Sequence, residues 1–268
     1  MLRQPAVAGM FYEQNPEMLR DNLAELWPSP RPETVAAIGA MTPHAGYMYS
    51  GRTAAKVYAR LNPAEVVILL GPNHTGRGWP MAVSHAEAWA TPLGRVPVDR
   101  DLTGGLLREC RLVKADDAAH EREHALEVQL PFLQQAFGRF SIVAVALGTD
   151  EFAPLQELGL VLAQLIRSDA RRCLLLASSD MNHFATLTRT KDLDHKALQQ
   201  VLSRNPQGLL ETVARERISM CGAIAAAVML VAAAELGADK AELVDYTTSA
   251  ETSGDAHRVV GYAGVIVR

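Results

Sequence analysis

Apolar runs alternate with amphipathic segments along most of the chain. The apolar runs are short, as in Val66-Val67-Ile68-Leu69-Leu70, and they are typical of strands buried on both faces of a sheet. The longer segments between them repeat their apolar residues with helical spacing. Strands are predicted at 35–42, 65–71, 81–84, 95–98, 141–147, 172–178, 241–247 and 258–267. Helices are predicted before residue 28 and at 51–61, 100–109, 122–137, 155–167, 189–203, 206–216 and 221–236.

Strands that alternate with helices favour an α/β protein with a mostly parallel sheet. We therefore predict a three-layer sandwich in which helices cover both faces of one central sheet. The last two predicted strands follow each other without a helix between them, so an antiparallel or mixed edge is expected. No repeat divides the chain, and residues 28–32 form only a short proline-rich connector. A single domain over residues 1–268 is expected.

Composition narrows the class of function and the cellular setting. The chain has 268 residues, 49% hydrophobic and 21% charged, with a formal net charge of −4, so a basic surface for nucleic acid is not expected. Its three cysteines lack paired spacing, which favours a reducing, cytoplasmic setting. The N-terminus lacks the apolar core of a signal peptide, and the apolar stretch 221–236 is short for a bilayer span. We therefore expect no association with a membrane.

Three of the predicted strands are each followed closely by a histidine. His44 and His74 follow the first two predicted strands, and His183 follows strand 172–178. Ligands of open α/β sheets bind beyond the carboxyl ends of the strands. If these three strands are parallel, the three imidazoles lie along one edge of the sheet.

His44 and His74 occupy matching positions, in the sequences TPHAG and GPNHTG. Either one alone could be an ordinary loop histidine that bonds to the backbone. Two in the same context favour a metal site, because histidine is the commonest metal ligand and strand ends hold it rigidly. We therefore predict that both bind a metal ion.

Cys221 begins the most apolar predicted helix, in the sequence ISMCGAIAAAV. A buried cysteine at this position could serve as a small hydrophobic residue. Alternatively, the helix N-terminus would favour the thiolate, which is the form that binds metals and acts as a nucleophile. The sequence leaves both interpretations open.

Asp180 and His183 lie close together in the sequence SSDMNHF. Histidine titrates near neutral pH without special tuning, so His183 could act as a general acid or base, with Asp180 orienting it or contacting substrate. The simpler alternative is an aspartate that caps a turn beside a surface histidine.

Glu123, His124 and Glu127 lie in the segment EREHALEVQLPF, which is predicted to be helical. His124 and Glu127 would share one helix face at a spacing of three residues. That spacing occurs in carboxylate-bridged metal helices, but a single copy also fits a solvated, charged helix face. Both interpretations remain open.

Seven motifs occur in the order found in one protein family. They are VAGMFYE, TPHAGYMYSG, GPNHTG, EREHALEVQLPFL, SSDMNHF, ISMCG and SGDAHRVVGYAG, and together they extend over nearly the whole chain. The chain resembles the Memo family, whose bacterial and archaeal members are labelled AmmeMemoRadiSam system protein B. The resemblance implies a fold similar to class III extradiol dioxygenases, which use non-haem Fe(II) at a strand-edge site.

The resemblance implies the metal ligands as well as the metal. His44, His74 and Cys221 match the metal ligands of the family. The related dioxygenases complete their ligand set with a carboxylate, whereas a cysteine stands in its place here. Fe(II) is the metal that we expect, and the softer thiolate also suits copper or zinc.

The resemblance also implies catalytic roles. His183 matches the pocket histidine that serves as acid and base in the dioxygenases, and His124 and Asp180 match pocket positions beside the metal. These three residues are the candidate catalytic residues. The expected function is that of a dioxygenase-like oxidoreductase acting on a small molecule, with aromatic or catechol-like compounds as candidates.

Two other functions fit the same resemblance. Animal Memo proteins are described as adaptors for phosphorylated receptor peptides, so the cleft could hold an extended peptide without catalysis. The site could also handle copper or iron without turning anything over. The family label further implies a pathway shared with a radical-SAM enzyme and an Ammecr-type protein.

Overall fold

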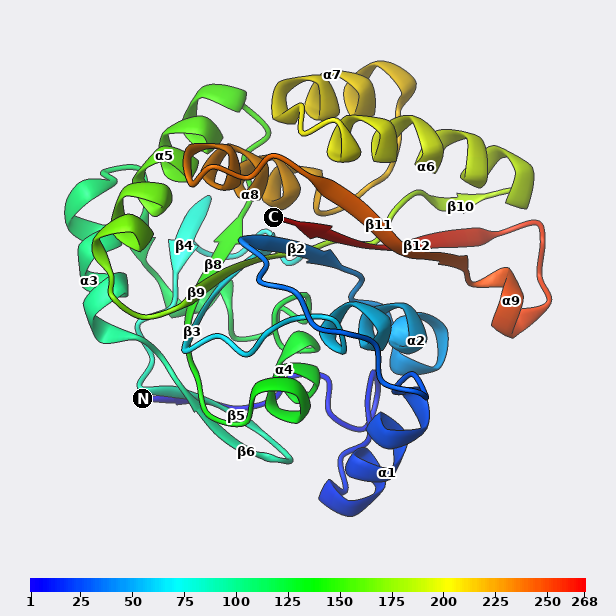
Figure 1. Cartoon of the computed structure of the whole chain (residues 1–268), viewed down its shortest axis with the longest axis horizontal. Helices are drawn as coiled ribbons and strands as arrows, with labels where there is room; N and C mark the ends of the chain where they lie inside the picture. Colours follow the sequence, from blue (N-terminus) through cyan, green and yellow to red (C-terminus); the bar gives the residue numbers. More distant parts are fainter.

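A nine-stranded sheet runs through the computed structural model, which describes all 268 residues (Figure 1). Its strands are β2 (Gly39–Thr42), β3 (Val66–Pro72), β4 (Met81–Val83), β7 (Lys114–Ala115), β8 (Ser141–Leu147), β9 (Cys173–Ser178), β10 (His183–Ala185), β11 (Ala241–Thr248) and β12 (Val259–Val267). They lie in the order β10-β12-β2-β9-β3-β8-β4-β7, and β11 pairs with β12 off this path. A separate three-stranded sheet consists of β1 (Leu2–Arg3), β5 (Ala88–Thr91) and β6 (Gly94–Pro97).

The centre of the large sheet is parallel and its margins are mixed. Strands β2, β9, β3 and β8 are parallel neighbours. Strand β12 pairs antiparallel with β2 on one side, and β4 pairs antiparallel with β8 on the other. The prediction of a mostly parallel or mixed sheet is therefore confirmed. Because the four central strands point the same way, their carboxyl ends meet along one edge.

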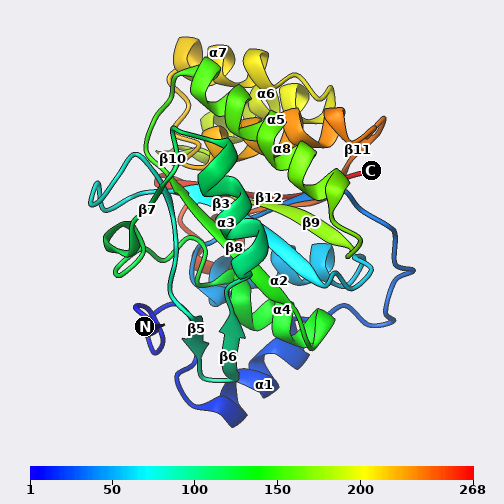
Figure 2. The ribbon, with the colours of Figure 1, turned by 90° about the vertical axis from the view of Figure 1, so that its left-hand side faces the viewer.

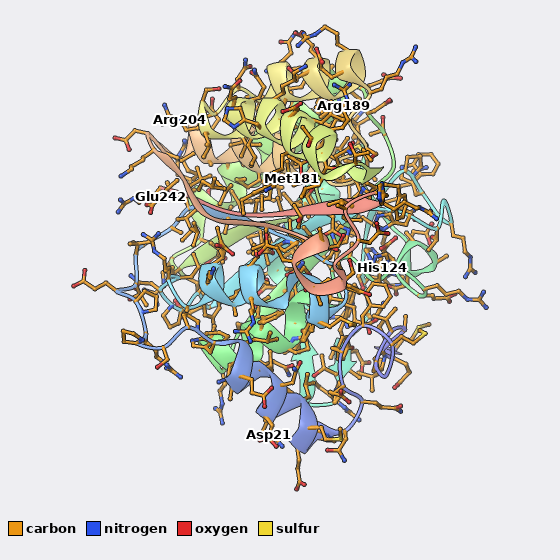
Figure 3. All side chains as sticks on the ribbon, turned by 90° about the vertical axis from the view of Figure 1, so that its right-hand side faces the viewer. Asp21, His124, Met181, Arg189, Arg204 and Glu242 are labelled. Atoms are coloured by element: carbon orange, nitrogen blue, oxygen red, sulfur yellow. The ribbon has the colours of Figure 1, made fainter.

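Helices cover both faces of this sheet. The helices are α1 (Pro16–Leu26), α2 (Tyr47–Tyr58), α3 (Arg100–Glu109), α4 (Gln129–Phe137), α5 (Phe152–Ser168), α6 (Leu187–Leu202), α7 (Pro206–Glu216), α8 (Ala223–Glu235) and the short α9 (Ala250–Ser253). Figures 2 and 3 show α5, α6, α7 and α8 on one side of the strands, and α1, α2 and α4 on the other. None of these helices is both long enough and apolar enough to cross a membrane.

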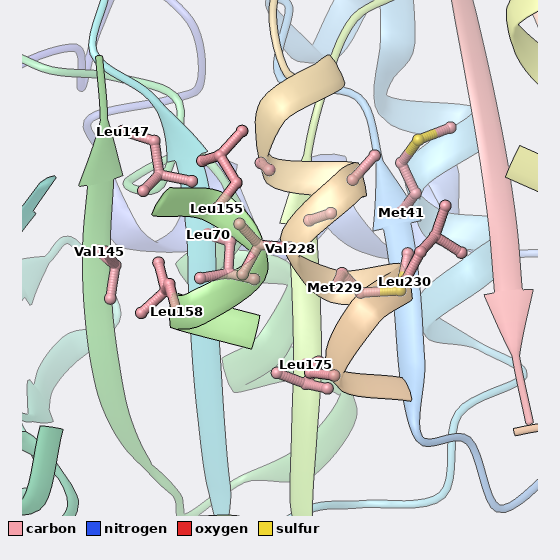
Figure 4. Packing of buried hydrophobic residues seen from close by; sticks show 14 of the residues in the cluster. Met41, Leu70, Val145, Leu147, Leu155, Leu158, Leu175, Val228, Met229 and Leu230 are labelled. Atoms are coloured by element: carbon pink, nitrogen blue, oxygen red, sulfur yellow. The ribbon is translucent and has the colours of Figure 1, made fainter. Parts of the chain in front are cut away.

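Alternate residues of each central strand supply two separate hydrophobic cores. In β3, Ile68 and Leu70 belong to a cluster of 38 buried residues under α5 and α8, whereas Val67 and Leu69 belong to a cluster of 29 under α2 and α4. This alternation follows from the two-residue period of a strand and explains why the strand is apolar throughout. Figure 4 shows side chains of α5 and α8 packed over Leu70 and Leu175.

Helix α8 lies in the middle of the first core, which explains its unusual sequence. Ten of its residues are buried, from Ala223 to Ala233, so nearly the whole circumference is apolar. It contacts β2, β3 and β9 as well as α5. The apolar stretch noted in the sequence is thus a buried helix, as predicted.

Three predicted elements differ from the structure by four or more residues at one end. The helix predicted at 51–61 begins earlier, at Tyr47, and ends at Tyr58. The strand predicted at 35–42 is shorter and begins at Gly39. The helix predicted at 122–137 begins only at Gln129, and the residues before it form turns and irregular backbone. The carboxylate of Glu123 accepts hydrogen bonds from the backbone N–H groups of His124 and Ala125, both at 2.9 Å, and this local turn takes the place of helix.

Truncation of a leucine in the sheet tests the core assignment. Leu175 of β9 is fully buried, so Leu175→Ala should lower the free energy of unfolding by about 2–5 kcal/mol, measured by urea denaturation. Leu160 of α5 has 43% of its surface exposed and serves as the control, and Leu160→Ala should change stability by no more than about 0.5 kcal/mol. Equal losses for the two variants would contradict this packing.

Candidate metal centre

Three strand ends deliver side chains to one place. His44 follows β2, His74 follows β3, and Asp180 follows β9. Since β9 lies between β2 and β3 and all three strands are parallel, these residues meet at one edge of the sheet. The predicted convergence is therefore observed for His44 and His74, whereas His183 lies further along the chain, at the start of β10, which pairs with β12.

The N-terminus of α8 brings Cys221 to the same edge. Gly222 donates its backbone N–H to Ser179 Oγ at 3.1 Å, directly beside the end of β9. A side chain on Gly222 would collide with the carbonyl oxygen of Ser178, and its Cβ would lie 2.5 Å from Ser179 Cβ. Only glycine permits so close an approach. As a result, Cys221 Sγ lies 3.1 Å from His44 Nε2.

His44, His74 and Cys221 form the candidate ligand set. Each offers one ligand atom, and the three atoms all lie within 4.8 Å of one another. His44 is buried and Cys221 is partly buried, whereas 33% of the surface of the His74 side chain is exposed to solvent. The structure thus brings together the three residues that the family resemblance implied as metal ligands, including Cys221, whose role the residues alone had left open.

Glu123 fixes the orientation of His74. Its Oε1 lies 2.9 Å from His74 Nδ1, and its Oε2 accepts the backbone N–H of His74 at 2.6 Å. A carboxylate can only accept, so Nδ1 carries the imidazole proton and Nε2 keeps its lone pair for a metal. Burial would raise the pKa of Glu123, but the hydrogen bonds from His74 and Ala125 hold it below the usual value. The sequence singled out Glu123 only as a neighbour of His124.

His124 lies beside the ligand set and outside it. Its ring stacks on His74 with 4.7 Å between centroids and packs against Phe11 at 4.8 Å. His74, Glu123 and His124 also form a close group, but both oxygens of Glu123 are already engaged by N–H groups. We therefore interpret this second group as support for His74.

Glu127 does not share a site with His124, so the metal-helix interpretation of this pair is wrong. The carboxylate of Glu127 is fully buried and paired with Arg3. It also accepts the backbone N–H groups of Ala6 and Val7 and the hydroxyl of Tyr12. A charge buried in this way needs several partners, and here they come from the N-terminal segment.

Asp180 and His183 flank the ligand set. Asp180 Oδ1 accepts the backbone N–H of His44 at 2.7 Å. Burial raises the pKa of Asp180 to about 6. His183 Nδ1 lies 2.8 Å from the carbonyl oxygen of Ser219, which can only accept, so Nδ1 is the protonated nitrogen of the neutral ring.

Comparison with known proteins assigns the family. The sequence profile described as Memo-like protein matches residues 3–266. The chain belongs to the Memo family. A MEMO1 family protein of Methanosarcina mazei is 42% identical over 267 residues, covering 99% of each chain. One from Archaeoglobus fulgidus is 40% identical over 267 residues, covering the full length of both.

A solved structure shares the fold of this Memo-family chain. It is the crystal structure of an uncharacterized protein from Escherichia coli K12, with a TM-score of 0.58. The match covers 84% of this chain and 98% of the other, at 14% sequence identity. At that identity the similarity concerns the fold alone.

In the metal-free protein, the surroundings of the centre favour the neutral forms of His44 and Cys221. Burial lowers the pKa of His44 well below its usual value, and the neighbouring His124 and His74 lower it further. Burial and Asp180 raise the pKa of the Cys221 thiol. Burial thus outweighs the helix N-terminus, which alone would favour the thiolate. A bound cation would supply the positive charge that a thiolate ligand needs.

A partly open cavity of about 360 Å³ lies between the N-terminal segment and the start of α2. Phe11, which packs on His124, is part of its wall. The backbone of Tyr47 is tied to Phe11 by a 2.8 Å hydrogen bond. The lining residues are Gly9, Met10, Phe11, Tyr12, Glu13, Asn22, Gly46, Tyr47, Met48 and Tyr49.

Substitution of Gly222 tests the close approach of α8. Gly222→Ala should lower the free energy of unfolding by about 1–3 kcal/mol, because the new methyl group collides with backbone that cannot easily move. It should also speed thiol labelling of Cys221 as the helix start shifts outward. In the control, Gly104 of α3 faces only the flexible end of Arg108, so Gly104→Ala should be neutral or stabilising by up to about 1 kcal/mol. Similar behaviour of the two variants would contradict the packing described.

Proposed function

We propose that this protein is a mononuclear metalloenzyme that oxidises a small molecule. His44, His74 and Cys221 would hold the ion, and our assignment for that ion is Fe(II). The observation that carries the proposal is the convergence of two histidines and a thiol within 4.8 Å. Glu123 engages Nδ1 of His74 and so leaves its Nε2 available as a ligand, and His44 Nε2 already faces Cys221 Sγ.

The chemistry of the donor set limits the choice of metal. Two imidazoles and one thiolate suit iron, copper and zinc better than magnesium or calcium, which prefer oxygen ligands. Three protein ligands leave coordination positions free for a substrate. When bound, the ion would supply Lewis-acid and redox chemistry. Copper and zinc remain the alternatives that metal analysis must separate from iron.

His183 is the proposed general acid and base. Its backbone N–H donates to Ser219 Oγ at 2.7 Å, and its Nδ1–H donates to the carbonyl oxygen of the same residue. The ring is therefore fixed, and Nε2 holds the lone pair that can take a proton from a substrate hydroxyl group. Asp180 can hold a proton near neutral pH because burial raises its pKa to about 6. His124 would shape the pocket through its stack on His74.

The cavity lined by Phe11 favours an aromatic substrate. Four of its ten lining residues are aromatic and two are methionines, and Phe11 also packs on His124 of the histidine stack. Methionine side chains make favourable contacts with aromatic rings and adapt to their shape. We propose that the part of the substrate that does not react lies in this cavity. A pathway shared with a radical-SAM enzyme and an Ammecr-type protein is part of the same proposal.

Peptide binding is the second candidate function. Met10 and Met48 line the cavity with 72% and 68% of their surfaces exposed, which is unusual for large apolar side chains and typical of binding surfaces. An adaptor would bind a peptide on this surface without catalytic turnover.

A metal-handling protein is the third candidate function. It would bind and release the ion without peptide binding or catalysis. Metal analysis followed by an oxygen-uptake screen over catechols separates the three.

Removal of a ligand histidine should remove the metal. Protein purified without air should contain close to one metal ion per chain, and His44→Ala or His74→Ala should lose most of it, as measured by elemental analysis. The exposed His195 of α6 provides the matched control, and His195→Ala should retain wild-type metal content. Equal metal in all four proteins would refute the ligand assignment.

Replacement of His183 separates catalysis from metal binding. His183→Ala should keep the metal, because the ring is not one of the ligands, yet lower turnover by about 10²–10⁴-fold on any substrate found in the screen. Asp180→Asn should cause a smaller loss. His257→Ala, an exposed histidine, is the control and should leave turnover unchanged. Loss of the metal in His183→Ala would show that the ligands are wrongly assigned.

A further inference from the structure

Ser178, the last residue of β9, stands at the junction of three polar groups. Its Oγ lies 2.6 Å from the carbonyl oxygen of Ala125, 2.7 Å from Gln129 Nε2 and 2.9 Å from His44 Nδ1. All four residues are buried, with at most 2% of their surface exposed. In such a site each hydrogen bond needs one donor and one acceptor, so the position of every proton can be worked out.

The amide of Gln129 is oriented by the backbone. Its Nε2 lies 3.0 Å from the carbonyl oxygen of Pro43, which can only accept, so the NH₂ group must face that side. On the other side, Gln129 Oε1 accepts the hydroxyl proton of Tyr58 at 2.7 Å. The second N–H of Gln129 therefore donates to Ser178 Oγ.

The single hydroxyl proton of Ser178 is donated to the carbonyl oxygen of Ala125. Ser178 Oγ and the carbonyl oxygen of Ala125 would repel each other at 2.6 Å unless a proton lay between them, and only Ser178 can provide it. Ser178 consequently accepts from His44, and Nδ1 of His44 must carry the proton. The lone pair of His44 is left on Nε2, the nitrogen that faces Cys221 Sγ.

We propose that Ser178 is a positioning residue that fixes His44 in the Nδ1–H tautomer and so prepares Nε2 to bind the metal. Gln129 supports it by filling the remaining lone pair of the hydroxyl and preventing its rotation. The consequence for affinity rests on the metal centre proposed above. The tautomer itself is a property of the metal-free chain and can be measured without any ion.

The first test uses the metal-free wild-type protein labelled with ¹⁵N in its histidines. At about pH 8, above the usual histidine pKa of about 6.5, ring ¹⁵N shifts distinguish the protonated nitrogen from the bare one. Nδ1 of His44 should be protonated and Nε2 bare, with the signals identified by their loss in His44→Gln. The opposite assignment, or a mixture of tautomers, would overturn the proposal.

The second test compares serine variants. Ser178→Ala should convert the single His44 tautomer into a mixture and weaken metal binding by about 10–100-fold. Ser178→Thr keeps the hydroxyl group and should preserve the Nδ1–H form. The control is Ser50→Ala, because Ser50 is buried and its Oγ bonds to the carbonyl oxygen of Ala45 without contacting His44. It should leave the ring shifts unchanged.

These outcomes separate the two proposals. An unchanged His44 tautomer in Ser178→Ala would show that the hydroxyl group does not position the ring. Absence of metal from every protein, with the Nδ1–H tautomer present in wild type and lost in Ser178→Ala, would refute the metal centre and leave the role of Ser178 supported.

Discussion

The close approach of α8 to the carboxyl end of β9 is the contact on which the candidate centre depends. The parallel order β2-β9-β3 places His44 and His74 at one edge of the sheet, but two histidines alone do not complete a ligand set. Gly222 allows the start of α8 to reach the end of β9, and the thiol of Cys221 then lies 3.1 Å from His44 Nε2. The buried and almost wholly apolar α8 holds this position because it is packed against α5 and the strands beneath it. The packing of the core around α8 therefore sets the position of Cys221 in the candidate centre.

A common pattern of hydrogen bonds orients the histidines. His44, His74 and His183 are each bonded through Nδ1, with Ser178, Glu123 and a backbone carbonyl as partners. The partners differ in charge: His74 meets a carboxylate, whereas the other two rings meet neutral oxygens. A carboxylate partner makes an imidazole a stronger donor to a metal. In our proposal this distinction would make His74 the more electron-rich ligand, while His183 stays free to exchange protons.

The local pattern of the chain was enough to predict most of the fold. The central strands could be located because they are almost entirely apolar and end at a glycine, proline or polar residue, as at Pro72 after the run from Val66. The segment 122–128 was predicted to be helical and is not. Its periodicity is real, but Glu123 folds back on the backbone N–H groups that follow it, and Glu127 is buried against the N-terminal segment. Helical periodicity indicates neither set of hydrogen bonds. The partners of Glu127 lie more than 100 residues away in the sequence.

By itself, the sequence determined that histidines follow the ends of buried strands. If those strands are parallel, their histidines lie at one edge of the sheet. Local hydrophobicity and the direction of the strands suffice for that conclusion. Only the tertiary structure decided that Cys221 joins them, that Glu123 orients His74, and that Ser178 and Gln129 enclose His44. These contacts join residues that lie 49 to 177 positions apart. Their distances are set by how helices pack on the sheet, and no spacing along the chain encodes them.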